Sequence, residues 1–416
     1  MENKKRNKPK RRFAGFTDDW EERKAANIAE YSKGNGYSKS DLTEVGTPII
    51  LYGRLYTNYQ FAIDEVDTFA TPKNGAVYSQ GNEVLIPASG ETAEDIARAS
   101  AVEKSGVLLG GDLNILWPFD FINPLFLALA ISSGEPQKEL AKKAQGKSVV
   151  HIHNSDIQEV SVSYPLRAEQ DQIVAVFRNL DHLITLHQRK LDKLGSIKKS
   201  YLSEMFPQEG EKKPKRRFKG FTDDWEKRKL GEIGKSTGGI SIESEFSENG
   251  IYKVVSIGSY SENSIYNDQG LRAVESDKTR DRVLNKGDIT MILNDKTSSG
   301  NIIGRVLLIE ESGIYVYNQR TERIEINTEK YDSLFIYEML NAPEIREKIV
   351  KQSQGNTQIY VNWSVISSTE YYIPEKEEQM KIGEFFHTLD HLITLHQRKL
   401  EKLKNIKQAY LNEMFV

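Results

Sequence analysis

Two stretches of the chain carry apolar residues in alternating steps of four and three positions. This is the spacing of a coiled-coil seam, along which one side of a long helix packs against another helix. The first seam runs through Ile173, Phe177, Leu180, Ile184, His187, Leu191, Leu194, Lys198, Tyr201 and Met205. The second runs through Ile382, Phe386, Leu389, Ile393, His396, Leu400, Leu403, Lys407, Tyr410 and Met414. Each stretch predicts a helix of about 40 residues, roughly 60 Å long.

The two predicted helices belong to a duplication that covers both halves of the chain. Leu180 to Leu191 is repeated residue for residue by Leu389 to Leu400, and Pro-x-x-x-Glu-Gln-x-x-Ile stands before each helix. A basic segment, residues 8–24, recurs at residues 213–229 with two substitutions. A long helix with one apolar side needs a partner, and the two copies can supply it to each other by packing antiparallel.

Between the basic segment and the helix, each half contains a less conserved arm with predicted strands. Apolar strands follow glycine turns at residues 49–51 and 253–255, and again at residues 84–86 and 290–292. The polar loops after these strands differ, so one scaffold carries two loop sets, as expected for related modules that read different sequences. We therefore predict an α+β protein with two tandem mixed α/β arms and two long helices, packed as an antiparallel coiled coil with pseudo-two-fold symmetry. The predicted domains are an arm at 1–165, a helix at 166–206, a second arm at 207–374 that begins with a linker at 207–217, and a helix at 375–416.

Length and composition narrow the function classes. A chain of 416 residues predicts two or three domains, and the duplication favours two. The net charge of -3 argues against a uniformly basic DNA-binding surface, so any such surface must be local or completed by a partner. The absence of cysteine excludes disulfides, thiolate metal sites and cysteine nucleophiles, and it fits a cytoplasmic protein. The longest apolar run, Phe126 to Ile131, is too short to cross a bilayer, so we expect a soluble protein without a membrane partner.

Several motifs suggest chemistry but lack the context that the chemistry needs. Ala141 to Ser148 resembles a relaxed phosphate-binding loop, but a helix-like stretch precedes it and a β-rich one follows, so a DNA-backbone loop or a plain turn is favoured. His151 and His153 lack a nearby cysteine or carboxylate cluster, which favours a structural or solvent role over a metal site. His187 and His396 lie in the seams, where a polar residue more plausibly fixes register.

Motifs of DNA-modifying enzymes are also incomplete. Asn123-Pro124-Leu125-Phe126 lacks the second proline of the amino-methyltransferase motif, and no Pro-Asp dipeptide opens the common nuclease motif. Together with the duplicated layout, these absences predict a chain with no catalytic residues.

The ordered repetition of arm, Pro-x-x-x-Glu-Gln-x-x-Ile and Leu-Asp-x-Leu-Ile helix resembles the specificity subunits of type I restriction-modification systems. The resemblance covers essentially the whole chain. It implies that each arm is a target recognition domain for one half of an asymmetric, bipartite site on double-stranded DNA. It implies that the helices set the gap between the halves and dock two methyltransferase subunits, to which restriction (motor-nuclease) subunits can add. It places S-adenosylmethionine in the methyltransferase subunit and ATP with Mg²⁺ in the restriction subunit, with no cofactor in this chain.

Base readout uses Arg, Lys, Asn, Gln, Ser and Thr in loops, with tyrosines packed on sugars and phosphates. In the first arm the candidate DNA-binding residues are Lys33, Ser38, Lys39, Tyr52, Arg54, Tyr56, Thr57, Ser89 and Thr92. In the second arm they are Ser256, Ser259, Tyr260, Asn294, Lys296, Thr297, Gln319 and Arg320. The candidate partner-binding residues are Phe177, Leu180, Ile184, Leu191, Leu194, Tyr201, Phe386, Leu389, Ile393, Leu400, Leu403 and Tyr410. Two alternatives stay open, namely an assembly protein whose arms bind ligands other than DNA and a standalone restriction enzyme.

Overall fold

The computed structural model describes residues 7–146, 149–295, 300–355 and 358–416. The chain divides into two compact units. Unit 1 comprises Met1–His187 and Lys399–Val416, and unit 2 comprises Gln188–Arg398. Each unit therefore contains one arm, the beginning of one long helix and the end of the other.

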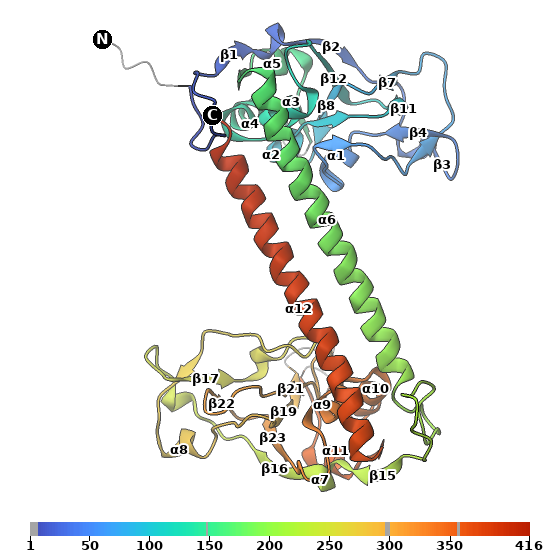
Figure 1. Ribbon diagram of the computed structural model, residues 1–416, viewed down its shortest axis with the longest axis vertical. Helices are drawn as coiled ribbons and strands as arrows, with labels where there is room; N and C mark the ends of the chain where they lie inside the picture. Colours follow the sequence, from blue (N-terminus) through green and yellow to red (C-terminus); the bar gives the residue numbers. More distant parts are fainter. Residues whose placement is uncertain (1–6, 147–148, 296–299, 356–357) are drawn as a thin grey trace. The chain divides into compact units, whose positions relative to one another are not determined.

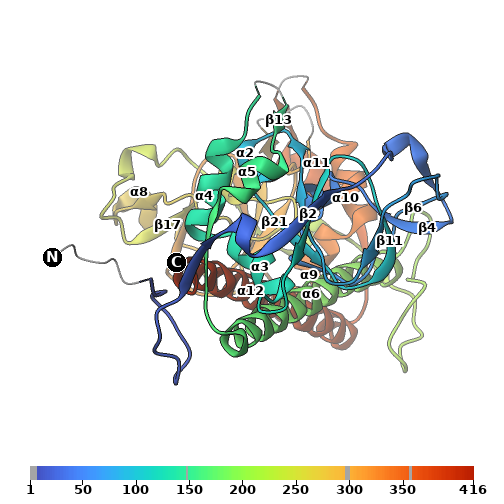
Figure 2. The same cartoon turned by 90° about the horizontal axis from the view of Figure 1, so that it is seen from above.

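The described part of the arm in unit 1 contains two five-stranded sheets and two short strand pairs. The first sheet has the order β2 (Ala29–Lys33), β12 (Leu113–Pro118), β8 (Val84–Pro87), β10 (Ser100–Val102) and β5 (Ala62–Ile63). The second has the order β3 (Leu42–Thr43), β6 (Phe69–Ala70), β4 (Thr47–Ile50), β11 (Ser105–Leu109) and β7 (Tyr78–Gln80). The pairs are β1 (Glu21–Lys24) with β14 (Ser161–Tyr164) and β9 (Ser89–Gly90) with β13 (Val150–His151). Figure 2 shows β4, β6 and β11 at one end of this arm, away from α4 and α5.

The helices of this arm are short, and α3 forms much of its core. They are α1 (Arg54–Thr57), α2 (Ala93–Ile96), α3 (Pro124–Ile131), α4 (Gly134–Lys143) and α5 (Asn154–Gln158), with 3-10 turns η1 (Ala25–Asn27) and η2 (Lys39–Asp41). Helix α3 is apolar on all sides and is buried from Leu125 to Ile131, as expected for a helix surrounded by protein. Asn123 caps its first turn by accepting hydrogen bonds from two backbone N–H groups, and Pro124 fits the first helical position.

The described part of the arm in unit 2 is built from the same kinds of elements. One sheet has the order β16 (Gly234–Gly238), β23 (Thr321–Ile326), β19 (Ile289–Ile292) and β21 (Val306–Leu308), and the other β18 (Arg272–Ala273), β17 (Tyr252–Val255) and β22 (Tyr315–Tyr317). The short pairs are β15 (Glu226–Lys229) with β25 (Glu370–Ile373) and β20 (Asn294–Asp295) with β24 (Ile359–Tyr360). The helices are α7 (Leu230–Ile233), α8 (Asp277–Arg280), α9 (Ser333–Asn341), α10 (Pro343–Val350) and α11 (Trp363–Ser368), with η3 (Glu243–Glu245) and η4 (Ile257–Ser259).

The four strands predicted after glycine turns are confirmed as β4, β8, β17 and β19. Their pairing is equivalent in the two arms, since β4 and β17 each have a parallel partner, whereas β8 and β19 pair antiparallel with β12 and β23. The turns before β8 and β19 need φ values of 94° at Gly81 and 89° at Gly287, which glycine adopts at little cost. The two arms therefore share one scaffold.

The long helices α6 (Arg167–Glu204) and α12 (Lys376–Glu413) have 38 residues each, which confirms the predicted helix pair. In unit 1 the start of α6 packs on the end of α12, where Asp181 forms an ion pair with Lys407 at 2.5 Å. In unit 2 the end of α6 packs on the start of α12, where the rings of Tyr201 and Phe385 are 5.0 Å apart. The contacts between a start and an end make the pair antiparallel in each unit, as predicted (Figure 1).

The core of each unit is completed by residues from the opposite half of the sequence. Phe415 lies in the core of unit 1, with its ring 5.7 Å from Phe126 and 6.5 Å from Trp20. Phe206 lies in the core of unit 2, with its ring 5.6 Å from Phe335 and buried beside α9. Burying such a ring contributes about 1.5–3 kcal/mol. The end of each long helix is thus fixed by the arm encoded in the other half.

Over the described ranges, no helix combines the length and the apolar character needed to cross a bilayer.

Candidate nucleic-acid interface

The duplicated basic segment and the duplicated glutamate form a buried clamp in each unit. The Arg12 guanidinium donates two hydrogen bonds of 2.7 Å to Glu169, and Arg217 donates two of 2.7 Å to Glu378. Both glutamates are buried. Their burial is tolerated because two charge-assisted hydrogen bonds from an arginine compensate each carboxylate for its lost hydration. These hydrogen bonds raise the pKa of both arginines. This pair of duplicated cations is therefore used within the fold.

The duplicated glutamine also has a structural role. Gln170 donates to the carbonyl oxygen of the motif proline at 2.9 Å and accepts from the Asn123 N–H at 2.8 Å. Gln379 makes the same pair of bonds, at 2.8 Å to its motif proline and 3.0 Å from the Asp332 N–H. Each glutamine thus ties the start of a long helix to the start of α3 or α9. The parts of the chain that differ between the units, the loops of the arms, are left as the candidates for reading a ligand.

In the first arm, part of the predicted DNA-binding set is exposed around the end of β2. Lys33 and Lys39 are exposed and form no ion pair with a described residue. Ser38 is exposed at the start of η2, where its backbone N–H donates to Asp41 at 2.9 Å. This local bonding fixes the turn that presents Lys39. Both lysines are therefore exposed cations that a ligand anion could pair with.

A second part of the first-arm set lies on and around α1. The Arg54 guanidinium donates to Asp67 and to Gln60, both at 2.9 Å, and its side chain is only 13% exposed. Tyr52 and Tyr56 are half-buried, with ring centroids 6.3 Å apart, and Thr57 is exposed and bonds to the Gly53 carbonyl oxygen. Arg54 is therefore neutralised within the arm.

The remaining first-arm candidates, Ser89 and Thr92, are used by the fold. Ser89 is buried and its hydroxyl lies 3.0 Å from Nδ1 of His151, across the β9–β13 pair. Thr92 is the N-cap of α2 and accepts from the Asp95 N–H at 3.1 Å. Among the described residues, no three potential ligands of the histidine, cysteine and carboxylate types gather around a common point, at His151 or elsewhere.

The segment Ala141 to Ser148, which resembles a phosphate-binding loop in sequence, has the reverse of the context that such a loop needs. Helix α4 precedes it and ends at Lys143, and Gln145 then forms an isolated bridge with His151. A nucleotide-binding loop follows a strand and opens a helix. Its last two residues, Lys147 and Ser148, lie outside the described residues. The geometry agrees with the favoured interpretation as a turn or a backbone-binding loop.

In the second arm, two predicted DNA-binding residues lie inside the protein. Ser259 is fully buried and its hydroxyl donates to the Val254 carbonyl oxygen at 3.1 Å. Tyr260 is 4% exposed in a cluster with Val255, and burial raises the pKa of its hydroxyl. The reason is η4, which turns the chain so that the residues at its end face inward. Ser256, at the start of η4, is half-buried and bonds through its N–H to Ser259 at 3.1 Å.

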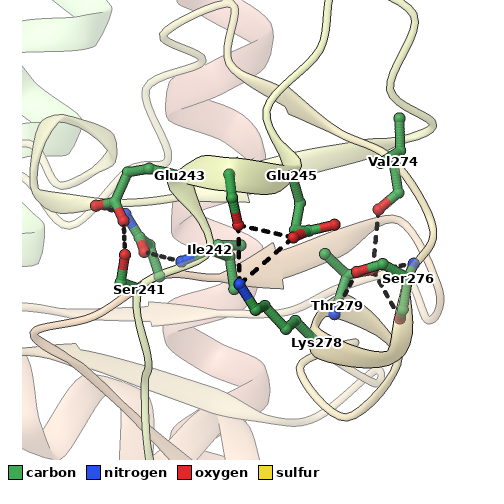
Figure 3. A network of polar contacts seen from close by, with 10 residues as sticks. Ser241, Ile242, Glu243, Glu245, Val274, Ser276, Lys278 and Thr279 are labelled. Atoms are coloured by element: carbon green, nitrogen blue, oxygen red, sulfur yellow. Dashed lines mark hydrogen bonds and ion pairs between the residues drawn. The ribbon is translucent and has the colours of Figure 1, made fainter.

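Gln319 and Arg320 are exposed in the turn between β22 and β23, and Glu243 orients the Gln319 side chain. One oxygen of Glu243 accepts from Asn318 Nδ2 at 3.0 Å and from Gln319 Nε2 at 2.9 Å. Its other oxygen accepts from the Ser241 hydroxyl, as Figure 3 shows. Hydrogen bonds from Ser241 and Asn318 lower the pKa of Glu243 to about 2, so the carboxylate stays ionised. Because a carboxylate only accepts, the Gln319 amide nitrogen faces it and the amide oxygen is left for a ligand.

The segment that carries Glu243 is itself anchored on α8. Lys278 donates to the Ser244 hydroxyl at 2.9 Å and lies 3.6 Å from Glu245 (Figure 3). Ser276 caps α8, and the Thr279 hydroxyl donates to the Val274 carbonyl oxygen at 2.9 Å. Arg320 has a φ of 69°, is exposed, and forms no ion pair with a described residue. An oriented amide oxygen and an available guanidinium therefore belong to consecutive residues of this turn.

The last second-arm candidates lie after β19. Asn294 is half-buried in β20 and pairs with Tyr360 of β24. This is the position that Ser89 and His151 occupy in the first arm. Lys296 and Thr297 lie outside the described residues.

The predicted partner-binding seam is mainly covered by the chain itself. Phe177, Leu180, Phe386, Leu389 and Leu400 are buried. The others are half-buried, namely Ile184, Leu191, Leu194, Tyr201, Ile393, Leu403 and Tyr410. The sequence reasoning missed a second apolar set that is duplicated but lies off the seam. Leu183 and Leu186 on α6 are 39% and 38% exposed, and Leu392 and Leu395 on α12 are 36% and 37% exposed. The sequence did contain a signal for this set, because these leucines repeat exactly at positions outside the seam.

Comparisons with known proteins bear on both the sequence and the fold. The family described as "Type I restriction modification DNA specificity domain" matches residues 17–196 and again residues 222–405. The type I restriction enzyme MjaVIII specificity subunit of Methanocaldococcus jannaschii is 24% identical over 403 residues, which cover 95% of this chain and 92% of that protein. The type I restriction enzyme HindI specificity subunit of Haemophilus influenzae is 28% identical over 202 residues, or 46% of this chain and 41% of that protein. The crystal structure of a type I restriction-modification S subunit from M. genitalium has the same fold, with a TM-score of 0.66 and 15% identity over 98% of this chain and 99% of that one.

Proposed function

Because the chain belongs to the family of type I restriction-modification DNA specificity domains, we propose that it reads a bipartite, asymmetric double-stranded DNA target. One half of the target is read by the arm of unit 1 and the other by the arm of unit 2. The observation that carries the proposal is the pair of arms with equivalent strand pairing and different exposed side chains. Lys33 and Lys39 are available in the first arm, and Gln319 with Arg320 in the second. Phosphate contacts would come from the lysines, whereas Gln319 and Arg320 have the chemistry to read base edges.

We expect Gln319 and Arg320, in the turn between β22 and β23, to prefer a particular base pair. An arginine fork matches O6 and N7 of guanine, and an amide oxygen accepts from N4 of cytosine. Since Glu243 holds the Gln319 nitrogen, the Gln319 oxygen is the group offered outward. We therefore expect at least one G·C pair in the half of the target that unit 2 reads.

The proposal includes partners, because the chain's own residues supply no complete catalytic motif. We propose that two methyltransferase subunits, which hold S-adenosylmethionine, dock on the long helices, and that restriction subunits using ATP and Mg²⁺ can join them. The exposed leucines support this, since Leu183, Leu186, Leu392 and Leu395 leave apolar surface that the helix pair does not cover. A serine at each of these four positions should weaken capture of a methyltransferase subunit while leaving the fold intact.

The experiment that tests the proposal exchanges one arm and maps DNA methylation. Residues 25–145 are replaced by the equivalent segment of a relative with another target, and the chain is expressed with its methyltransferase subunit. The half of the motif read by unit 1 should change and the other half should stay. A change in both halves, or a motif identical to the original, would contradict modular reading.

The helices offer a second test of the same proposal. Seven residues inserted after His187 and after His396 keep the seams in register and lengthen each helix by roughly 10 Å, close to three base pairs of B-DNA. Both read halves should survive, with about three more unread base pairs between them. Full methylation at the original spacing would show that the helices do not set the gap.

A further inference from the structure

Unit 2 contains a cavity that the proposed function does not use. Its volume is about 1030 Å³, and it is lined by the end of α6, the start of α12, β21, α9 and α10. The chemically distinctive lining residues are Lys198, Arg305, Tyr337, Glu338, Arg346 and Asp390. Charged side chains therefore line a cavity that also borders the hydrophobic core.

Arg346 is a buried cation for which the described residues supply no counter-charge. It is 7% exposed, and its Nε and Nη1 atoms are buried without a hydrogen-bond partner among the described residues. Burial, with a smaller contribution from the charge of Arg305, lowers its pKa to about 9. A guanidinium that remains charged inside a protein needs a counter-charge, because burial of an unpaired charge is strongly unfavourable.

Six carboxylates line the cavity, Asp192, Glu262, Glu310, Glu311, Glu338 and Asp390, and three of them are bound by other residues as follows. Lys198 donates to both oxygens of Asp390 at 2.7 Å and lies 3.3 Å from Glu338. Glu262 accepts a hydrogen bond from Asn301 at 2.8 Å. Arg305 forms no ion pair with a described residue, although Glu262 is near enough for its charge to act on Arg305 and Arg305 Nε donates a long hydrogen bond of 3.4 Å to the Asn301 carbonyl oxygen. The other N–H groups of Arg305 and those of Arg346 are the ones that a ligand could use.

The fold that the two units share does not require the charged residues that line this cavity. Gln170 and Gln379 bind the starts of α3 and α9 in the same way, which aligns these helices between the two units. In this alignment Leu129 is equivalent to Glu338, and Gln137 is equivalent to Arg346. Leu129 is buried in the hydrophobic core of unit 1. At the first of these positions one unit thus has a buried leucine where the other has a buried glutamate.

We propose that Arg346 and Arg305 bind a phosphate group in the cavity of unit 2. Planar guanidinium groups bind phosphate through paired hydrogen bonds, and two of them supply the charge that a dianion needs. The phosphate has two possible sources, a free phosphate-bearing molecule and the backbone of bound DNA. The site itself does not rest on the proposed function; only the DNA source does.

The test uses the full chain and inorganic phosphate as the probe, at constant ionic strength kept with sodium chloride. Phosphate should raise the melting temperature of the wild-type chain and give a saturable binding isotherm. Arg346→Met should weaken phosphate binding at least tenfold, and Arg305→Met should weaken it severalfold. Arg280→Met, which removes an exposed arginine of the same unit, should leave binding unchanged. Without phosphate, Arg346→Met should melt no lower than the wild type, because it removes an unpaired buried charge.

Two outcomes would overturn the proposal. One is a wild-type melting temperature that phosphate shifts no more than chloride does, and the other is phosphate binding that survives in the Arg346→Met variant. The two sources separate in a DNA-binding assay of the complex with its methyltransferase. A backbone phosphate predicts that Arg346→Met weakens DNA binding and reduces the salt slope by about one. A free ligand predicts lost phosphate binding with unchanged DNA binding, and neither result depends on which bases are read.

Discussion

In each unit an equivalent ion pair joins the two long helices, but the residues around the ion pair differ between the units. In unit 1 Lys407 pairs with Asp181 beside an apolar arm, where Leu129 fills the nearby position of α3. In unit 2 Lys198 pairs with Asp390 and also contacts Glu338, which is 2% exposed. The duplicated residues therefore determine how the helices pack, whereas the arm determines whether an apolar or an ionisable side chain lies beside them. Divergence after duplication has reached the core as well as the loops.

Removing the exchanged aromatic ring should have the largest effect on this comparison. Phe415→Ala should cost about 3–5 kcal/mol in unit 1, and Phe206→Ala a similar amount in unit 2, because each leaves a large cavity among rings. Hydrogen exchange resolved by peptide should show the loss of protection in the unit that receives the ring. Leu395→Ala, at an exposed leucine, is the matched control and should change little. Loss of protection in the unit encoded by the same half would contradict the exchanged packing.

Breaking the buried clamps should have the next largest effect and should distinguish the units. Arg12→Met leaves Glu169 uncompensated, whereas Arg217→Met leaves Glu378 with a hydrogen bond of 3.1 Å from Trp225 Nε1. We expect about 2–4 kcal/mol for each, with the larger value for Arg12→Met, because the unpaired carboxylate there keeps fewer donors. Urea unfolding followed by peptide-resolved exchange measures both. Equal costs would mean that the tryptophan bond contributes nothing.

The arginines of the two arms should differ in how they affect DNA recognition. Arg320→Ala should relax discrimination at one position of the target by about 1–3 kcal/mol. Arg54→Ala should leave base discrimination unchanged, because its guanidinium is paired with Asp67. Binding measured on a panel of targets with single base changes checks both. A uniform weakening over all targets by Arg320→Ala would make it a phosphate contact instead.

The smallest effect concerns pH and the buried carboxylate of unit 2. Burial raises the pKa of Glu338 from 4.5 to about 8, and the nearby charges are those of Lys198 and Asp390. Since the folded-state pKa is the higher one, this group stabilises fully below pH 4.5, and the contribution is lost as the pH rises through about 8. Glu338→Leu should therefore flatten the pH dependence of unit 2 and make it roughly 1–2 kcal/mol more stable at the alkaline end.

The reciprocal change, Leu129→Glu, tests the same comparison from the other side. It should give unit 1 a loss of stability with rising pH that the wild-type unit lacks. Urea unfolding at several pH values between about 5 and 9 measures both variants. A Glu338→Leu chain with an unchanged pH profile would show that this carboxylate is not the group responsible.

The sequence predicted what is periodic or duplicated and missed what depends on distant contacts. The seam positions and the strand that contains Val84 could be read because spacing alone fixes which face is apolar. The environment of Arg54 could not, because its pairing with Asp67 depends on how the intervening chain folds back. Tyr260 was assigned to the surface because its strand and loop resembled those of the first arm, but η4 turns it inward. The packing of Phe206 in unit 2 and of Phe415 in unit 1 could not be predicted. The repeat shows that the segments after the two long helices are alike, but it does not show which core each of them enters.

The position of Phe415 in unit 1 also sets the timing of folding during synthesis. The ribosome completes the first arm and its half of α6 roughly 200 residues before it makes the segment that closes their core. At about 5–20 residues per second, that delay is on the order of 10–40 s. Throughout it the rings of Trp20 and Phe126 lack the neighbour that covers them in the finished chain. A message that ends early would therefore release a protein with an open first arm, which chaperones and proteases can recognise.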